Sequence, residues 1–257
     1  MTATPPRRSA LTTTSFGLLT LALGLGMVVI TGAALTLRSP DSTLLPIMAD
    51  HPVVLAEGRK LYVQRHEVTI AEWNICAAEG ACTLEMRVRS HNDPATTPAT
   101  GLSYVDVQEY IVWINEASGH DFRLPHAAEW DAMAAAVLHK RPAPIFTDPA
   151  LAWASGYLTE GIVPRALKQQ GHFSTSPEGI SDLDGSVWEW TQDCYAGTAA
   201  DADPAWCPAY VVSGEHVAVI PYLTRDPANG GCAVGMPPAH LGMRLVTDSP
   251  LGNSPAQ

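Results

Sequence analysis

Two tryptophans flank a carboxylate at the end of the stretch Gly179–Trp190, directly after an acidic turn that contains a glycine. In a strand, Trp188 and Trp190 would share one face, and Glu189 would point to the other. Burial of both indoles would hold the carboxylate and the preceding turn carbonyls in fixed positions, as a hard cation requires. The same spacing is typical of a half-buried strand whose glutamate is simply solvated, so the pattern alone leaves both interpretations open.

Five cysteines supply the softer ligands and nucleophiles of the chain. Cys76 and Cys82 bracket a short loop, and Cys194 and Cys207 bracket a second one, so we predict two disulfides formed in an oxidising compartment. Metal ligation is the alternative, but these spacings are not those of a zinc site. Cys232 is then a free thiol. Its small neighbours favour a buried thiol, while a reactive thiol and a bond to another subunit stay open.

The nine histidines show neither the H-x-H nor the H-x3-H spacing of common metal sites. Each is therefore interpreted as a surface or packing residue. A metal site assembled from His172, His216 and His240 after folding is the alternative that the sequence leaves open.

The N-terminal part of the chain predicts a membrane anchor. Residues 16–37 carry no charge, and at about 1.5 Å per residue a helix of this length spans roughly 33 Å, enough to cross a bilayer. Arg7 and Arg8 precede this run, which places the N-terminus in the cytoplasm and exports the rest. A cleaved signal peptide, with Gly32-Ala33-Ala34 at its cleavage site, is the alternative.

The composition predicts one irregular domain. About 200 residues follow the anchor, enough for a sizeable core. The 21 prolines and 20 glycines limit regular structure, so the expected class is irregular α+β. Only 16% of residues are charged and the net charge is −11, without a basic stripe, which argues against nucleic-acid binding.

Local patterns place the elements that must position these residues. Thr69 and Ser103 are expected helix N-caps, the second with Asp106 as a near capping box. Prolines and polar residues predict exposed loops over 83–98 and, with one possible short strand, over 142–179. The expected elements are a hairpin within 53–66, helices over 70–78, from Ser103 to near Gly119 and over 127–138, an extended segment at 123–125, and strands at 187–192, 211–212, 217–222 and 242–246.

Four sequence blocks, in order, resemble the formylglycine-generating enzyme (sulfatase-modifying factor) family. DLDGSVWEW at 182–190 resembles the family's D-M-x-G-N-V-W-E-W signature, and HEVTIAEW at 66–73 resembles its early Y-E-V-T block. The stretch 98–136, with RLPHAAEW at 123–130, is similar to the central block that ends in R-L-P-T-E-A-E-W. LGMRLV at 241–246 resembles the closing G-F-R-L-V.

This resemblance implies a complex variant of the C-type-lectin-like fold with little regular structure. It implies calcium held by the side chain of Asp184, the carbonyls of Gly185 and Val187, and the carboxylate of Glu189. It also implies a buried scaffold in which an arginine and a glutamate pair beside an aromatic plug, made of Arg123, Glu129, Trp130 and Arg244. His126 replaces the usual threonine and is expected to cap the following helix with its ring.

The family's oxidase chemistry uses a cysteine pair that binds copper and activates dioxygen, close before the closing block. The corresponding positions here fall near Tyr222 and Pro227, and only Cys232 remains once the disulfides are drawn. A linear two-thiolate copper site needs two soft ligands, so we expect no catalytic residues of this kind and no copper. The sulfoxide synthases, a related branch, take iron histidines from a separate helical domain, for which this chain has no room.

The function predicted from the sequence is therefore that of an accessory or binding subunit with a catalytically degenerate domain, attached to a protein partner in the membrane or periplasm. The alternative is a metal-dependent oxidase or maturation factor of altered chemistry, with iron or copper, serving a periplasmic metalloenzyme. Carbohydrate binding ranks last, because the E-P-N and Q-P-D sugar motifs are absent. The expected location is a bacterial inner membrane, with residues 1–15 cytoplasmic, 16–37 as the anchor, 38–51 as a tether or the start of the domain, 52–247 as the periplasmic domain, and 248–257 as a flexible tail.

Overall fold

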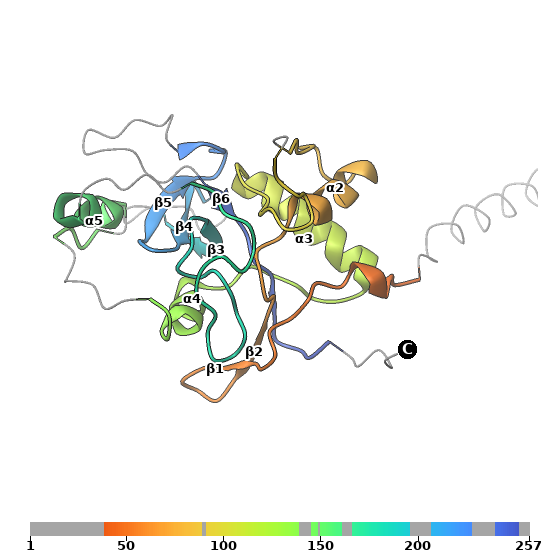
Figure 1. Ribbon diagram of the computed structural model, residues 1–257, viewed down its shortest axis with the longest axis horizontal. Helices are drawn as coiled ribbons and strands as arrows, with labels where there is room; N and C mark the ends of the chain where they lie inside the picture. The colour runs from red at the N-terminus through yellow and green to blue at the C-terminus, as the bar shows by residue number, and fades with distance from the viewer. Residues whose placement is uncertain are drawn as a thin grey trace, which may run out of the picture. The chain divides into compact units, whose positions relative to one another are not determined.

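The computed structural model describes residues 39–88, 91–138, 145–148, 150–160, 166–195, 207–227 and 240–251 (Figure 1). The predicted anchor at 16–37 and Cys232 lie outside these ranges. Within them, no helix combines the length and the apolar character needed to cross a membrane. The folded unit begins at Pro40. Residues 40–51 belong to this compact unit.

The helices in the described ranges are a short 3-10 helix η1 (Ser42–Leu44), α2 (Ile70–Ala78), α3 (Tyr104–Ser118), α4 (Ala127–Ala134) and α5 (Ala152–Glu160). Three of them, α2, α3 and α4, begin where the sequence predicts them, whereas η1 and α5 were not predicted. Thr69 with Glu72, and Ser103 with Asp106, form complete capping boxes at the starts of α2 and α3. α3 ends at Gly119, whose left-handed backbone a glycine adopts without strain.

The strands form two small sheets. β1 (Val53–Val54), β2 (Lys60–Val63) and β7 (Val246–Thr247) make an antiparallel sheet in the order β1-β2-β7. β3 (Trp188–Cys194), β4 (Ala209–Ser213), β5 (Ala218–Pro221) and β6 (Leu241–Gly242) make a second sheet in the order β5-β4-β3-β6. β6 runs parallel to β3, whereas the other neighbours are antiparallel.

Two apolar clusters hold these elements together. The larger one surrounds Trp73, Trp113 and Trp190, and joins α2 and α3 to the four-stranded sheet. In Figure 1, α2 and α3 lie beside that sheet, and the β1–β2 hairpin projects at the other end of the domain. The smaller cluster packs Trp130 of α4 against Leu61 of β2 and residues near 180. Regular structure is sparse, and the core is built largely from irregular segments.

Four expectations about local structure were wrong or incomplete. A helix, α5, forms at 152–160 where only loops and a possible strand were expected, and α4 ends at Ala134 rather than near 138. The strand expected over 242–246 is two short strands in different sheets, β6 and β7, because Arg244 turns inward between them. Asp248, expected in a flexible tail, pairs with Arg59 and Arg123 at 2.6 and 3.0 Å.

Both predicted disulfides are present, Cys76–Cys82 and Cys194–Cys207. The first closes the loop after α2, and the second joins the end of β3 to the residues just before β4. Each closes a short loop, for which chain-entropy arithmetic gives about 2–3 kcal/mol of stabilisation.

We predict one titratable thiol per chain when the purified protein is denatured without reductant. The five cysteines less the four in disulfides leave one, and reduction should raise the count to all five. A thiol-reactive chromophore measures both numbers. The variant Cys232→Ser should give no thiol before reduction, and more than one in the parent chain would contradict the pairing.

Candidate functional site

A buried arginine lies at the centre of the residues that the sequence singled out. Arg244 is fully buried between β6 and β7. Its Nε and Nη2 donate to Glu189 Oε1 at 3.0 and 2.8 Å, and its remaining N–H groups reach the carbonyls of Gln64, Arg65 and Ser181. Trp130 Nε1 donates to Glu189 Oε2 at 2.8 Å. The predicted aromatic plug is therefore confirmed, with Glu189 as the partner of Arg244.

The other predicted scaffold pair is also present. Arg123 donates to both oxygens of Glu129, at 2.7 and 2.9 Å, and Arg59 approaches the same carboxylate at 2.8 Å. Burial opposes the charge of Glu129, but these arginines and the backbone N–H of His126 outweigh it and lower the pKa of Glu129 to about 2. The carboxylate therefore stays ionised over the ordinary pH range.

Glu67 is a second carboxylate beside Arg244, and sequence reasoning missed it. It is 1% exposed, and its Oε2 accepts no hydrogen bond among the described residues. That oxygen lies 3.6 Å from Arg244 Nη2, farther than Glu189 does. One guanidinium neutralises one buried carboxylate, and Glu189 is the better placed. Burial, reinforced by the charge of Glu189, raises the pKa of Glu67 to about 8 despite the attraction of Arg244.

Asp182 completes this buried polar region. It is the one described non-glycine residue with a positive φ, 68°, which places it in the left-handed region. Its carboxylate accepts from the backbone N–H groups of Gly171 and Phe173 at 2.6 and 2.8 Å, and lies 3.3 Å from His66 Nδ1. These contacts outweigh burial and lower its pKa. The acidic turn is thus fixed mainly by Asp182, which the sequence did not single out from its neighbours.

The two carboxylates of the calcium set implied by the sequence accept hydrogen bonds from protein donors. Both oxygens of Glu189 take the contacts described above, and Asp184 accepts from the backbone N–H and hydroxyl of Ser174 at 3.0 and 2.6 Å. In the described part of the chain, no group of three or more His, Cys, Asp or Glu residues is arranged to hold a metal. A cation at Glu189 would have to replace Arg244, and calcium at Asp184, Gly185, Val187 and Glu189 stays a prediction.

The three histidines of the alternative metal site, His172, His216 and His240, have different surroundings. The ring of His172 packs edge-on against Phe173, and that of His216 against Trp188, while His240 lines a surface cleft. His126 does not cap α4 with its ring as expected. Its Nδ1 lies 3.0 Å from Asp193 Oδ1, and the second oxygen of Asp193 accepts the N–H of Ala127 in its place.

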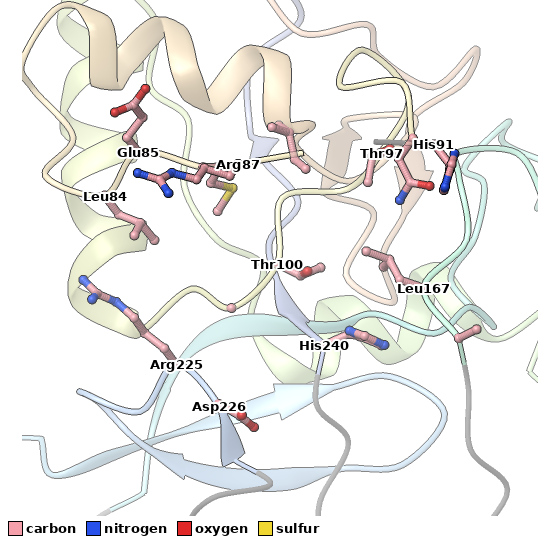
Figure 2. Close-up of a pocket in the computed structure, with 15 residues that line it drawn as sticks. Leu84, Glu85, Arg87, His91, Thr97, Thr100, Leu167, Arg225, Asp226 and His240 are labelled. Atoms are coloured by element: carbon pink, nitrogen blue, oxygen red, sulfur yellow. The ribbon is translucent and has the colours of Figure 1, made fainter. Parts of the chain in front are cut away.

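This surface cleft has a volume of about 800 Å³, within the range of ligand pockets (Figure 2). One wall is the segment after the first disulfide, another is the stretch from Thr97 to Gly101, and a third comes from residues 166–167. Arg225 and Asp226 close it below the first wall. The polar side chains that line it are Glu85, Arg87, His91, Asn92, Thr97, Thr100, Arg225, Asp226 and His240.

Arg225 stands between Tyr222 and Pro227, where the family resemblance places the catalytic cysteines. Its Nε and Nη2 donate to the two oxygens of Asp106 at 2.8 and 2.6 Å, a bidentate pair that charge-assisted bonding favours. Asp106 is 2% exposed and completes the capping box of α3 with Ser103. This ion pair lowers the pKa of Asp106 although burial opposes it. The guanidinium of Arg225 thus lines the cleft in the segment where the family resemblance implies catalytic cysteines.

With the fold and this geometry established, the comparisons define the class of protein. A model of the sulfatase-modifying factor enzyme 1-like domain matches residues 22–249. The chain therefore belongs to that family, as the four sequence blocks predicted, and its mixed, irregular architecture is the fold of the family.

Solved structures with some similarity to this chain share little sequence with it. PvdO from Pseudomonas aeruginosa is 17% identical, with a TM-score of 0.49 and coverage of 79% of this chain and 92% of that one. Variable protein 1 of Treponema denticola is 12% identical, with a TM-score of 0.47 and coverage of 79% and 93%. CarF is 15% identical, with a TM-score of 0.47 and coverage of 78% and 96%. No curated protein matches the chain.

We predict that the buried Glu67 makes the domain less stable as the pH rises. Its folded pKa lies above its unfolded value, so its contribution is complete below about pH 4.5 and is lost as the pH approaches about 8. The variant Glu67→Gln keeps the shape and cannot ionise. Urea unfolding at several pH values should therefore show a smaller loss of stability for this variant between pH 5 and 8.

The matched control is Glu116→Gln, a change at an exposed glutamate of α3. Its stability should follow the parent protein at every pH. If Glu67→Gln also followed the parent curve, Glu67 would be ionised in the folded state, and the assignment of its proton would be wrong.

Proposed function

We propose that this protein is a membrane-anchored, exported accessory or binding subunit whose domain lacks the cysteine-pair oxidase chemistry of its family. The observation that carries the proposal is the cysteine inventory. Four of the five cysteines are in disulfides, so the chain retains at most one thiolate, whereas a linear copper site needs two. The chain retains the family's fold but not the pair of thiolates that a copper site needs.

The cleft supports a binding role for the same region. Arg225 and Asp226 occupy the segment that would carry the thiols, and the arginine is fixed to the buried Asp106. A guanidinium cannot coordinate copper, because it has donors and no acceptor. It is well suited to hold an anionic or polar group. The altered chemistry of this position favours recognition over oxidation.

The exposed loops predicted over 83–98 and 142–179 both contribute residues to this cleft. Residues 84–87, 91, 92 and 97 come from the loop over 83–98, and residues 166–167 come from the long irregular stretch before Gly179. Binding residues are commonly carried on such loops and positioned by a rigid scaffold. The scaffold here is provided by the two disulfides and the buried ion pair of Arg244. A protein partner in the membrane or periplasm is the proposed occupant of this surface.

The proposed location follows from the N-terminal sequence. Residues 16–37 would anchor the chain in a bacterial inner membrane, with residues 1–15 in the cytoplasm and the domain in the periplasm. Disulfides form and persist in that compartment, which is consistent with the two pairs in the domain. Neither nucleic acid nor carbohydrate is proposed as a partner.

We predict that the purified full-length protein contains no stoichiometric copper or iron and consumes no dioxygen with a cysteine-containing peptide. Elemental analysis and an oxygen electrode measure the two quantities, and the same elemental analysis tests for calcium. One copper per chain together with oxygen uptake would contradict the proposal and favour the oxidase or maturation factor. The Cys232→Ser variant is the control, because it would abolish any metal binding that depends on the remaining thiol.

We also predict that the full-length protein purified from detergent-solubilised membranes carries a second protein in a fixed ratio. Mass spectrometry of the complex after two chromatographic steps identifies the partner, and a native mass gives the ratio. A homogeneous preparation of this chain alone, under conditions that preserve membrane complexes, would contradict an accessory role. The oxidase measurements above are independent of this result.

A further inference from the structure

We infer that the cleft recognises a carboxylate, which binds between Arg87 and Arg225 while the apolar part of the ligand packs on Leu84 and Met86. This inference rests on the proposed binding role and names the chemistry of the ligand. It concerns two arginines whose free N–H groups face the same cavity. Carboxylates are the natural partners of guanidinium groups, because two parallel N–H donors match their two oxygens.

Arg225 is held in place before any ligand arrives. Asp106 takes its Nε and Nη2, and the same carboxylate accepts from the backbone N–H and the hydroxyl of Ser103 at 2.8 and 2.5 Å. Nη1 makes no hydrogen bond to any described residue, and 52% of the side chain is exposed. Binding to a guanidinium that is already ordered costs less side-chain entropy than binding to a mobile one.

Arg87 supplies the second guanidinium from a wall that is also fixed. The side chain of Asn74 bonds the backbone N–H and carbonyl of Met86, both at 2.9 Å, and Trp73 Nε1 donates to the carbonyl of Leu84 at 2.6 Å. The Cys76–Cys82 disulfide closes the loop that leads into this wall. The Arg87 side chain itself is exposed and forms no ion pair with a described residue.

The two guanidinium groups lie at the same end of the cleft. Figure 2 shows them on either side of Leu84, whereas His91 and Leu167 lie at the opposite end. The apolar surface between and beside the arginines, from Leu84 and Met86, suits a hydrocarbon segment next to a carboxylate. The arrangement therefore selects an anion with an apolar body over a simple inorganic ion.

Asp106 balances the charge of Arg225 but leaves its Nη1 without a hydrogen bond to a described residue, and the acidic residues that line the cleft form no ion pair with either arginine in the described part of the chain. Glu85 lies on the same wall, and no oxygen of it comes within 4.0 Å of the nitrogens of Arg87 or Arg225. The carboxylate of Asp226 points away from both arginines in Figure 2 and has a contact elsewhere. Since the chain as a whole carries a net charge of −11, no general attraction for anions operates, and affinity must come from these two side chains.

Titration calorimetry on the full-length protein in detergent tests the inference with probes of known chemistry. The probes are hexanoate with hexanamide, and N-acetyl-Ala-Leu-Leu with a free or an amidated C-terminus. We expect the carboxylate of at least one pair to bind roughly tenfold or more tightly than its amide, the size of a charged hydrogen bond. Preference within the small acids or within the peptides identifies the source of the carboxylate. Equal binding of acid and amide in both pairs, or no binding of either acid, overturns the inference.

Three variants locate the effect. Arg87→Gln breaks no contact between described residues and should weaken the acid roughly tenfold while leaving the amide unchanged. Arg225→Lys keeps the positive charge but not the fork, and should weaken the acid to a similar extent, with circular dichroism and Tm confirming that the domain folds. Lys60→Gln removes an exposed cation of β2, outside the cleft, and should change neither affinity. Unaltered acid binding by Arg87→Gln would overturn the inference.

These measurements are separable from those on the proposed function. Loss of the carboxylate preference in a protein that still carries its partner and no copper would refute the ligand chemistry alone. Copper with oxygen uptake would refute the binding role whatever the calorimetry shows.

Discussion

The ion pair between Arg244 and Glu189 is the interaction on which the rest of the domain depends. It is fully enclosed, and it joins β3 to the segment between β6 and β7 while the remaining guanidinium donors bind carbonyls from residues 64, 65 and 181. Removing one partner of such a pair typically costs about 3–5 kcal/mol, because the other charge stays buried. This domain has few long strands or helices. The hydrogen bonds of one arginine to four residues therefore hold its segments together, as the backbone hydrogen bonds of a large sheet would in another fold. The buried Glu67 and the turn at Asp182 are arranged round this arginine.

The sequence predicted well the features that depend on local or covalent chemistry. Capping residues such as Thr69 and Ser103 place helix starts because the bonds they make lie within three residues. The two disulfides followed from spacing and compartment. The strand predicted around Met243 failed because Arg244 is drawn inward by partners more than fifty residues away, which no local pattern reports. The helix at 152–160 was missed because the surrounding prolines and irregular composition pointed to a loop.

The candidate site was harder to predict than the helices, because it depends on contacts between residues that lie far apart in the sequence. The W-E-W block was recognised as unusual, but its role as the partner of an arginine could not be told from that of a calcium ligand. Both uses call for a buried carboxylate beside indoles, and the sequence pattern does not report that Arg244 reaches Glu189. The cleft was not predictable as a unit, since its lining residues come from several stretches that lie far apart in the sequence. Arg225 was not predicted as a site residue, because the family resemblance indicates cysteines in that segment and gives no role to an arginine.

The pairing of β2 with β7 brings the two ends of the domain into one sheet, with Tyr62 opposite Thr247. Gln64 and Arg123, from the first half of the sequence, also bond to residues 245 and 246. Contacts so distant along the chain form slowly, because long loops must close before they are stabilised. A polypeptide that emerges from a ribosome therefore lacks β7, the partner of β2, until residues 246 and 247 have been made. The three-stranded sheet cannot form before β7 is available, and until then the β1–β2 hairpin and the apolar core residues are exposed to aggregation.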